Sequence, residues 1–225
     1  MTAYMFGGKR MKSLGLHSLR NGGSRISVSF WVCICYSGVG TLTPIDGNLN
    51  TEKYISLLDS HLWQVVAKNF GNAPWIFQDD NCPCHMSERA KNWKTQNNIP
   101  CLDWPSQSPD LNLIENVWRM IKIRLARVQH KIKTKQELID NVMTIWASFT
   151  PGYIQCLYNT IPDRLQAVIK DKGHATKYWK IQMSTTNSFN VSLIFTTLFY
   201  CSQYRWHRKN VTHLWHGTVD TNYLQ

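Results

Sequence analysis

Acidic residues are scarce in this 225-residue chain, and the earliest one is Asp46. Fourteen Asp and Glu stand against twenty-five Lys and Arg, which gives a formal net charge of +11. A positive surplus of this size favours a polyanionic partner, and nucleic acid is the usual one. A basic protein without such a partner is the alternative that charge alone leaves open.

Long apolar runs are missing as well. Residues 1–12 lack the apolar stretch of a secretory signal. The best apolar run near the C-terminus, residues 191–200, is interrupted by Ser192, Thr196 and Thr197. It is far shorter than the roughly 20 residues that a membrane-spanning helix needs. We therefore expect a soluble protein with no membrane partner.

The cysteines lack the pattern of a disulfide framework. There are seven of them, an odd number at irregular spacing. This usage favours a reducing compartment such as the cytosol or the nucleus.

Hydrophobic periodicity predicts an α/β domain. Apolar alternation indicates a hairpin, and a short apolar run before two acidic residues indicates a buried strand. Caps and apolar spacings of three and four residues place the helices. The predicted strands cover residues 26–34, 41–45, 75–78 and 99–104, and the predicted helices cover 51–70, 87–96, about 112–125, a segment capped by Thr134 and Glu137, and 150–173. This order is typical of a mixed sheet with helices on its faces.

Two carboxylates have the layout of a metal-dependent nuclease site. Asp80 ends the predicted buried strand, Glu115 begins a predicted helix, and thirty-four residues separate them. Phosphodiester cleavage is served by two divalent ions about 3.5–4 Å apart, held by acidic side chains. Mg²⁺ and Mn²⁺ prefer such oxygen ligands. We therefore predict that Asp80 and Glu115 are catalytic metal ligands.

Structural roles are the alternatives for both residues. Asp80 could cap the loop after its strand, and Glu115 could complete a capping box with Asn112. Asp79 adds an ambiguity, because neighbouring strand residues point to opposite faces and only one of the two aspartates can face the site.

Several motifs in this chain resemble the catalytic domain of mariner-superfamily transposases, in the Tc-type branch. The likeness covers roughly residues 22–178, and its Trp-Pro-Ser-Gln-Ser-Pro-Asp stretch is highly specific. The spacing from Asp80 to Glu115 also matches the Asp-to-Glu interval of that branch. The matching segments are FQDDN at 77–81 with Pro83 and His85, WPSQSPDLN at 104–112, IENVW at 114–118, SGVG at 37–40, IDG at 45–47 and GHATKY at 173–178.

This resemblance implies an RNase H-like fold, shared with retroviral integrases, and cut-and-paste DNA transposition by an Asp-Asp-Glu metal site. Asp80 would be the second catalytic Asp and Glu115 the catalytic Glu, both as ligands of Mg²⁺ or Mn²⁺. The implied partner is DNA, the implied location is the nucleus, and a homodimer is compatible with the family. We divide the chain into a divergent remnant at 1–21, the catalytic domain at 22–178 and a poorly ordered tail at 179–225.

The N-terminal part departs from the family pattern. The family's first Asp lies on a strand upstream of the position of Gly22, but none of the first twenty-one residues is acidic. We therefore expect the first strand to be missing, one edge of the sheet to be unpaired, and metal binding and DNA cleavage to be weak. The family's N-terminal paired helix-turn-helix domain is also absent from these residues. The alternative function is a non-catalytic DNA-binding or protein-interaction module derived from a transposase.

The segment Cys82-Pro83-Cys84-His85 also differs from the family at its two cysteines. Two thiols and an imidazole in four residues suggest zinc. No second ligand cluster at matching spacing accompanies them, so drift in a loop is the interpretation that the sequence favours. His85 matches the family motif, but the sequence assigns it no role.

Basic residues follow Glu115 along one stretch of the chain. They predict non-specific phosphate contacts with salt-sensitive affinity, and a solvated helix face is the alternative. Trp118 and Trp146 fall on apolar faces and are expected in the core. The basic residues are Arg119, Lys122, Arg124, Arg127, Lys131, Lys133 and Lys135.

Overall fold

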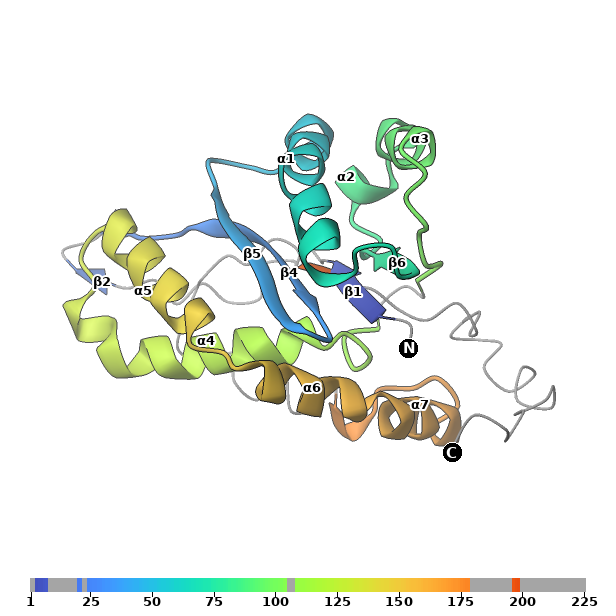
Figure 1. The fold of residues 1–225 in the computed structure, drawn as a ribbon. Helices are drawn as coiled ribbons and strands as arrows, with labels where there is room; N and C mark the ends of the chain where they lie inside the picture. Colours follow the sequence, from blue (N-terminus) through green and yellow to red (C-terminus); the bar gives the residue numbers. More distant parts are fainter. Residues whose placement is uncertain (1–2, 8–19, 22–23, 105–107, 179–195, 199–225) are drawn as a thin grey trace.

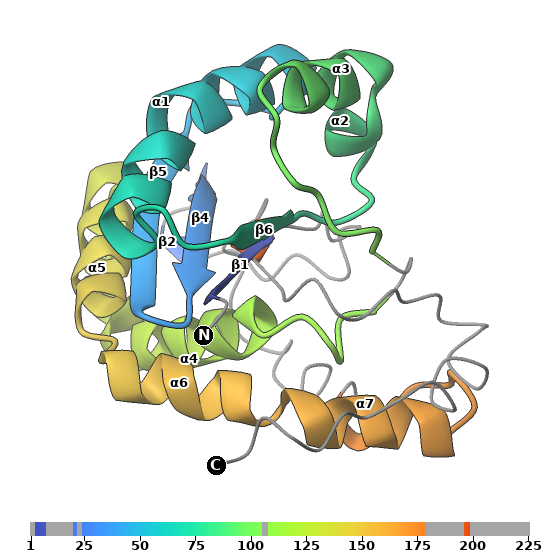
Figure 2. The same ribbon diagram turned by 45° about the vertical axis from the view of Figure 1, so that its right-hand side comes forward.

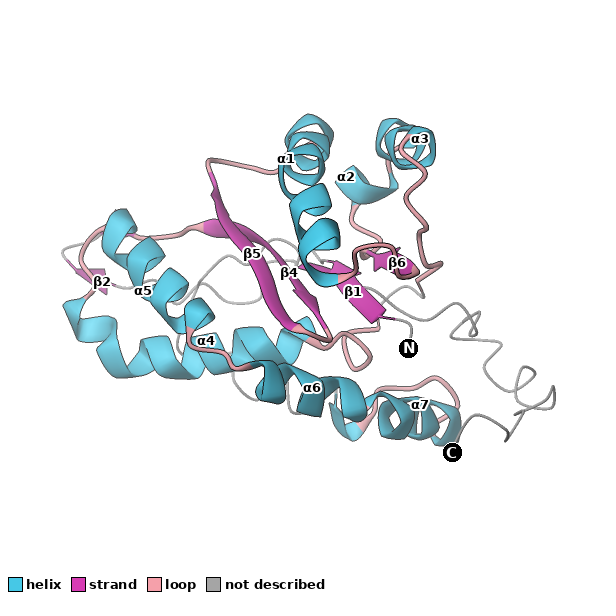
Figure 3. Cartoon of the chain, in the orientation of Figure 1, coloured by secondary structure: helices cyan, strands magenta, loops and turns pink. Residues whose placement is uncertain are grey.

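The computed structural model describes residues 3–7, 20–21, 24–104, 108–178 and 196–198, and its helices lie on both sides of a mixed sheet (Figures 1 and 3). The strands are β1 (Ala3–Gly7), β2 (Arg20–Asn21), β3 (Ser24–Arg25), β4 (Ser29–Cys35), β5 (Gly38–Ile45), β6 (Trp75–Gln78) and β7 (Thr196–Leu198). The helices are α1 (Thr51–Asn69), α2 (Pro83–Met86), α3 (Glu88–Gln96), α4 (Ile114–Val128), the 3₁₀ turn η1 (Gln129–Lys131), α5 (Lys135–Ala147), α6 (Pro151–Asn159) and α7 (Ile161–Lys170).

The main sheet has the strand order β1-β6-β7-β4-β5. β4 and β5 form the predicted antiparallel hairpin, and β6 covers the predicted residues 75–78. β1 runs parallel to β6, while β7 pairs with β4 in parallel and with β6 in antiparallel. β2 and β3 form a separate two-stranded ladder.

Strand β4 divides the hydrophobic core into two parts. All seven of its residues are buried, because helices cover both faces of the sheet (Figure 2). Phe30, Val32 and Ile34 pack with residues of α4, α5 and α6. Trp31 and Cys33 pack on the other side, with residues of α1 and β6. The alternation predicted a strand, and the second helical layer explains why neither of its faces is exposed.

The structure corrects the expectation that the first strand is missing. Ala3–Gly7 forms β1, whose residues 3–6 are in parallel register with residues 75–78 of β6. β1 therefore occupies the position beside β6, so the edge of β6 that was expected to be unpaired is hydrogen-bonded to β1. The correction concerns the backbone alone, because β1 has the sequence AYMFG and brings no carboxylate.

Two other expected elements differ from the structure. Instead of a strand over 99–104, the structure has an isolated bridge between Phe77 and Cys101. The single helix expected from Thr150 is divided into α6 and α7, with Pro162 in the first turn of α7. Proline has no N–H to donate and its ring clashes with the preceding turn, so the helix breaks although the apolar spacing continues.

Two helix caps that the sequence predicted are present in the structure. Thr134 and Glu137 form the expected capping box of α5, and Thr150 caps α6 ahead of Pro151. Apart from Thr196–Leu198, which form β7, the expected tail at 179–225 lies outside the described residues. Among the described residues, no helix combines the length and apolar character needed to cross a membrane.

Candidate active site

The two adjacent aspartates after β6 have different partners. Asp79 is buried and forms an ion pair with Lys94, whose Nζ lies 2.8 Å from Oδ2. The hydroxyl of Tyr54 donates to the same oxygen at 2.5 Å. Burial first, and the charge of Asp79 second, raise the pKa of Tyr54 well above its ordinary value, so the hydroxyl keeps its proton. Asp79 therefore joins β6 to α1 and α3, which leaves Asp80 for the site.

Asp80 is also buried, and its two carboxylate oxygens differ in their contacts. Its Oδ1 accepts a hydrogen bond from the N–H of Cys82 at 3.0 Å and lies 3.0 Å from Nδ1 of His85. Its Oδ2 is buried and finds no hydrogen-bond partner among the described residues. Burial raises the pKa of Asp80, and the hydrogen bond with His85 partly opposes this rise. A buried, unpartnered carboxylate oxygen is costly unless a cation or a donor reaches it, so Asp80 fits a metal ligand.

His85 positions the Asp80 carboxylate. It lies in α2, it is 1% exposed, and its ring packs 4.0 Å from the ring centroid of Tyr54. Burial alone would lower the pKa of His85, but the hydrogen bond with Asp80 and the charges of Asp80 and Asp79 give a net rise. The sequence left this residue without a role, since only the structure shows which atom its ring contacts.

Glu115 lies in the first turn of α4 and is half-buried. The N-cap position is Leu113 rather than Asn112, and no side chain caps the helix, so Asn112 and Glu115 do not form a capping box. Instead, Oδ1 of Asn112 accepts from the N–H of Ile114 at 3.4 Å. A carboxylate in the first turn is favoured by the partial positive charge of the helix N-terminus.

The segment between the two carboxylates is fixed at both ends. Near β6, the amide of Asn81 donates to the carbonyl of Trp104 at 3.0 Å, so this segment begins beside Asp80. Near α4, the buried Arg164 donates to the carbonyl of Asp110 at 2.7 Å and to Oδ1 of Asn116 at 2.9 Å. These contacts fix Trp104 beside Asn81, and Asp110 and Asn116 beside α7. That Asp80 and Glu115 share an ion remains a prediction.

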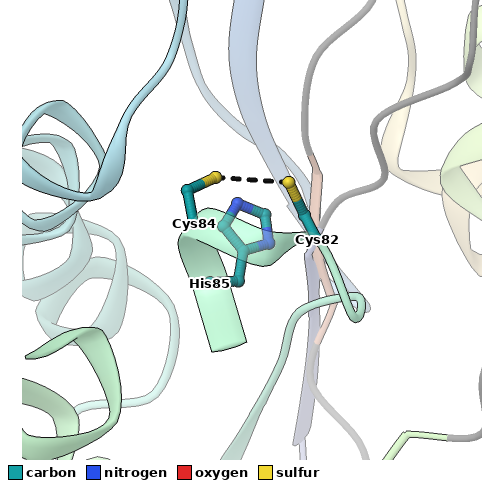
Figure 4. A group of neighbouring side chains, drawn as sticks. All are labelled: Cys82, Cys84 and His85. Carbon is teal, nitrogen blue, oxygen red and sulfur yellow. Dashed lines mark hydrogen bonds between the residues drawn. The ribbon is translucent and has the colours of Figure 1, made fainter. Parts of the chain in front are cut away.

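A third carboxylate does not complete this arrangement within the described part of the chain. β1 lies beside β6 without an acidic residue. The described residues contain one group of three or more Cys, His, Asp or Glu side chains with ligand atoms within 4.8 Å of one another, and it consists of Cys82, Cys84 and His85 (Figure 4).

The two thiols of this group are in contact. Sγ of Cys82 lies 3.2 Å from Sγ of Cys84. The hydrogen bond with Cys84 is the main cause that lowers the pKa of Cys82 to about 6, and the same contact raises the pKa of Cys84. The sequence favoured drift in a loop at these positions, whereas the structure gathers the three possible ligands around one point.

The basic residues after Glu115 fall into two classes. Arg119, Lys122 and Arg124 are half-buried, and Arg124 donates to Oγ of Ser148 at 2.6 Å. Burial lowers the pKa of Lys122, and the charge of Glu115 opposes the shift. The exposed residues are Arg127, Lys131, Lys133 and Lys135, of which Lys135 forms an ion pair with Asp46.

Comparisons with known proteins agree with this arrangement. Residues 2–139 match the family model described as DDE superfamily endonuclease. The Tcb1 transposase of Caenorhabditis briggsae is 34% identical over 72% of this chain and 57% of its own length. The Tc1 transposase of Caenorhabditis elegans is 31% identical over the same shares. The chain thus spans a little over half the length of these curated relatives.

The fold also has solved counterparts. The catalytic domain of Mos1 mariner transposase superposes with a TM-score of 0.55 at 14% sequence identity, covering 67% of this chain and 84% of that one. Structures of the same domain with raltegravir and Mg or Mn give TM-scores of 0.54 and 0.55. At this identity the likeness concerns the fold, which is RNase H-like as the motifs implied.

Proposed function

The chain belongs to the DDE superfamily endonuclease family, and from this premise we propose that it is a transposase-derived protein that binds DNA and holds a divalent cation with Asp80 and Glu115. The reaction class is metal-dependent cleavage and strand transfer of DNA, as in transposition and integration. Its relatives are named transposases of transposable elements.

The single observation that carries this proposal is the position and burial of the Asp80 carboxylate. Its carboxylate lies directly after β6, it is 4% exposed, and Oδ2 is buried with no hydrogen-bond partner among the described residues. Asp80 and Glu115 are the residues that would hold Mg²⁺ or Mn²⁺. When bound, such an ion polarises a phosphoryl oxygen and lowers the pKa of the attacking water. The Mos1 catalytic domain has been solved with each of these two metals.

The same geometry predicts that cleavage is weak. β1, the strand beside β6, supplies no carboxylate, and Oδ1 of Asp80 already contacts His85 and the Cys82 amide. Two carboxylates offset the charge of two dications poorly at the short separation that the mechanism needs. We therefore infer low activity in the chain as it stands. This absence on β1 also favours the second candidate function, a non-catalytic DNA-binding module.

DNA is the partner that the charge supports. The net charge is +11, and Arg127, Lys131 and Lys133 are exposed after the site. The Mos1 transposase has been solved as a paired-end complex, with a TM-score of 0.53 to this chain. A homodimer on DNA is therefore the assembly that we propose, and the nucleus is the matching compartment.

A plasmid-nicking assay tests the enzymatic proposal. The full chain is incubated with supercoiled DNA and Mn²⁺ or Mg²⁺, in parallel with Asp80→Ala, Glu115→Ala and a control, Asp59→Ala, which removes an exposed carboxylate from α1. We expect slow nicking that is lost in the first two variants and kept in the control. Equal nicking by Asp80→Ala and the unchanged protein would overturn the site. DNA binding without nicking in every sample would support the non-catalytic module.

A further inference from the structure

We propose that Cys82, Cys84 and His85 form a second metal site, built for a thiophilic ion such as Zn²⁺ and placed directly beside Asp80. The described ligand atoms lie within 4.8 Å of one another, and Cys82 and His85 are buried. This site is distinct in chemistry from the pair of carboxylates, because thiolate and imidazole ligands select zinc or copper over magnesium.

The backbone gives the cluster its shape. Cys82 is the N-cap residue of α2, and Cys84 and His85 lie within that short helix. Pro83 starts the helix, and the N–H of His85 donates to the carbonyl of Cys82 at 2.9 Å. This tight turn brings the two sulfur atoms to 3.2 Å, and the imidazole ring of His85 extends towards them (Figure 4).

The distances suit zinc after small side-chain adjustments. Zinc binds sulfur at about 2.3 Å and nitrogen at about 2.0–2.1 Å in a tetrahedral arrangement. Its ligand atoms are therefore separated by roughly 3.5 to 4 Å. The observed cluster brackets that range, with the two sulfurs slightly closer and the whole group within 4.8 Å. On zinc binding the two sulfurs would therefore move apart by a few tenths of an ångström.

Asp80 supplies the orientation that a histidine ligand needs. Its Oδ1 lies 3.0 Å from Nδ1 of His85, so a neutral imidazole that donates its Nδ1–H to Asp80 carries its lone pair on Nε2. A carboxylate behind a histidine ligand fixes the tautomer and makes the ligand nitrogen more basic. The ring of Tyr54 packs against His85 at 4.0 Å and limits its rotation.

Three protein ligands leave one tetrahedral position for water or another group. Sites with three protein ligands and an open position are typical of zinc that can bind a further ligand, whereas purely structural sites have four protein ligands. Zinc at this site would also place a dication next to Asp80. His85, as a zinc ligand, would keep its hydrogen bond to Oδ1 of that carboxylate.

Cobalt substitution is the direct test. The reduced full chain is titrated with Co²⁺, which reports thiolate ligands by sulfur-to-metal charge-transfer absorption, and Zn²⁺ is then added in competition. We expect one equivalent of Co²⁺ with this absorption, displaced by one equivalent of Zn²⁺. Cys84→Ser and His85→Ala are expected to weaken binding at least tenfold, and Asp80→Asn about 10- to 100-fold, the usual range for an outer-shell partner.

The matched control is Cys156→Ser, which removes an exposed cysteine from α6, far from α2 in the sequence. It must keep the full cobalt signal. Absence of the charge-transfer absorption in the unchanged protein would overturn the proposal. So would its persistence in the Cys82→Ser/Cys84→Ser double variant.

A second measurement avoids variants that fail to fold. The unchanged chain is alkylated with and without Zn²⁺, and the modified cysteines are located by peptide mass spectrometry. Zinc should protect Cys82 and Cys84 at least tenfold and leave Cys156 as reactive as before. Equal alkylation of all cysteines with and without zinc would contradict the site. If Cys82 and Cys84 form a disulfide in air, and the reduced cysteines bind no metal, the two residues are a redox pair instead.

Discussion

Asp79 and Asp80 are neighbours in the sequence, but their surroundings give them different chemistry. Asp79 has a cation and a hydroxyl as partners, in Lys94 and Tyr54. Asp80 has a backbone N–H and His85 on one oxygen, and nothing on the other among the described residues. The sequence showed that one of the two must face away from the site, but it could not tell which, because the deciding partners come from α1 and α3.

The titration of His85 tests its contact with Asp80. In metal-free protein, NMR should give a pKa of His85 above its ordinary value of about 6.5, because Asp80 stabilises the imidazolium. Asp80→Asn should lower that pKa, because burial is then opposed only by the charges of Asp79 and Cys82. As the folded-state pKa is raised, the stabilisation from the charged pair is complete below about pH 6.5 and is lost as pH rises through the folded-state value. An unchanged His85 pKa in the variant would contradict the pairing.

The ion pair of Asp79 and Lys94 should stabilise the fold as a unit. Their side chains are 8% and 7% exposed, so removal of one partner leaves a buried charge. Lys94→Met should lower the free energy of unfolding by about 3 kcal/mol, measured by urea denaturation. The double variant Asp79→Leu/Lys94→Met should recover most of that loss, because neither charge remains. A double variant as unstable as the sum of the two single ones would show that the pair does not act as a unit.

At the scale of helices and strands, sequence patterns predicted the elements whose characteristic residues are contiguous in the chain. β6 was predicted at its observed bounds because a short apolar run ends at two acidic residues. β1 was missed, because its place in the sheet depends on parallel pairing with residues seventy-two positions later. Pro162 lies within an apolar spacing that continues from α6 to α7, so the break between these helices was also missed. Arg164 had the pattern of an ordinary helical cation, and its partners Asp110 and Asn116 are about fifty residues away.

Arg164 is expected to position the first turn of α4. It is 2% exposed, burial lowers its pKa to about 10, and it donates to Asp110, Asn116 and Thr160. Arg164→Ala should destabilise the protein by about 3 kcal/mol, since several buried acceptors lose their donor. Hydrogen exchange should show the largest loss of protection at the start of α4.

Arg164→Lys separates charge from geometry. Lysine keeps the positive charge but lacks the planar set of donors that reaches three acceptors at once. It should therefore recover less than half of the lost stability. A Lys variant equal to the unchanged protein would show that charge alone is sufficient.

At the scale of the whole molecule, the positive charge and the RNase H-like fold both support a protein that works on DNA. The family and the position of Asp80 could be predicted from the motifs, since the Trp-Pro-Ser-Gln-Ser-Pro-Asp stretch and the acidic pair are contiguous. The absence of a carboxylate beside β6 could be predicted from composition. The strand that nevertheless occupies that place required coordinates.

DNA affinity should depend steeply on salt through the exposed cations. Each phosphate contact contributes about −0.9 to the slope of log K against log salt concentration on B-form DNA. The triple variant Arg127→Ala/Lys131→Ala/Lys133→Ala should therefore make the slope less steep by about 3, measured by fluorescence anisotropy. The matched control Lys68→Ala/Lys91→Ala/Lys170→Ala removes the same charge from exposed positions on α1, α3 and α7. Equal slopes in the two triple variants would show that net charge alone governs binding.

The sharing of one cation by Asp80 and Glu115 is tested most directly by Mn²⁺ binding, followed by electron paramagnetic resonance. The unchanged chain should bind Mn²⁺ weakly, and Asp80→Ala, Glu115→Ala and the double variant should all lose that binding to the same extent, while Asp59→Ala keeps it. Mn²⁺ binding that survives either single variant, or losses that add in the double variant, would show that the two carboxylates act at separate places.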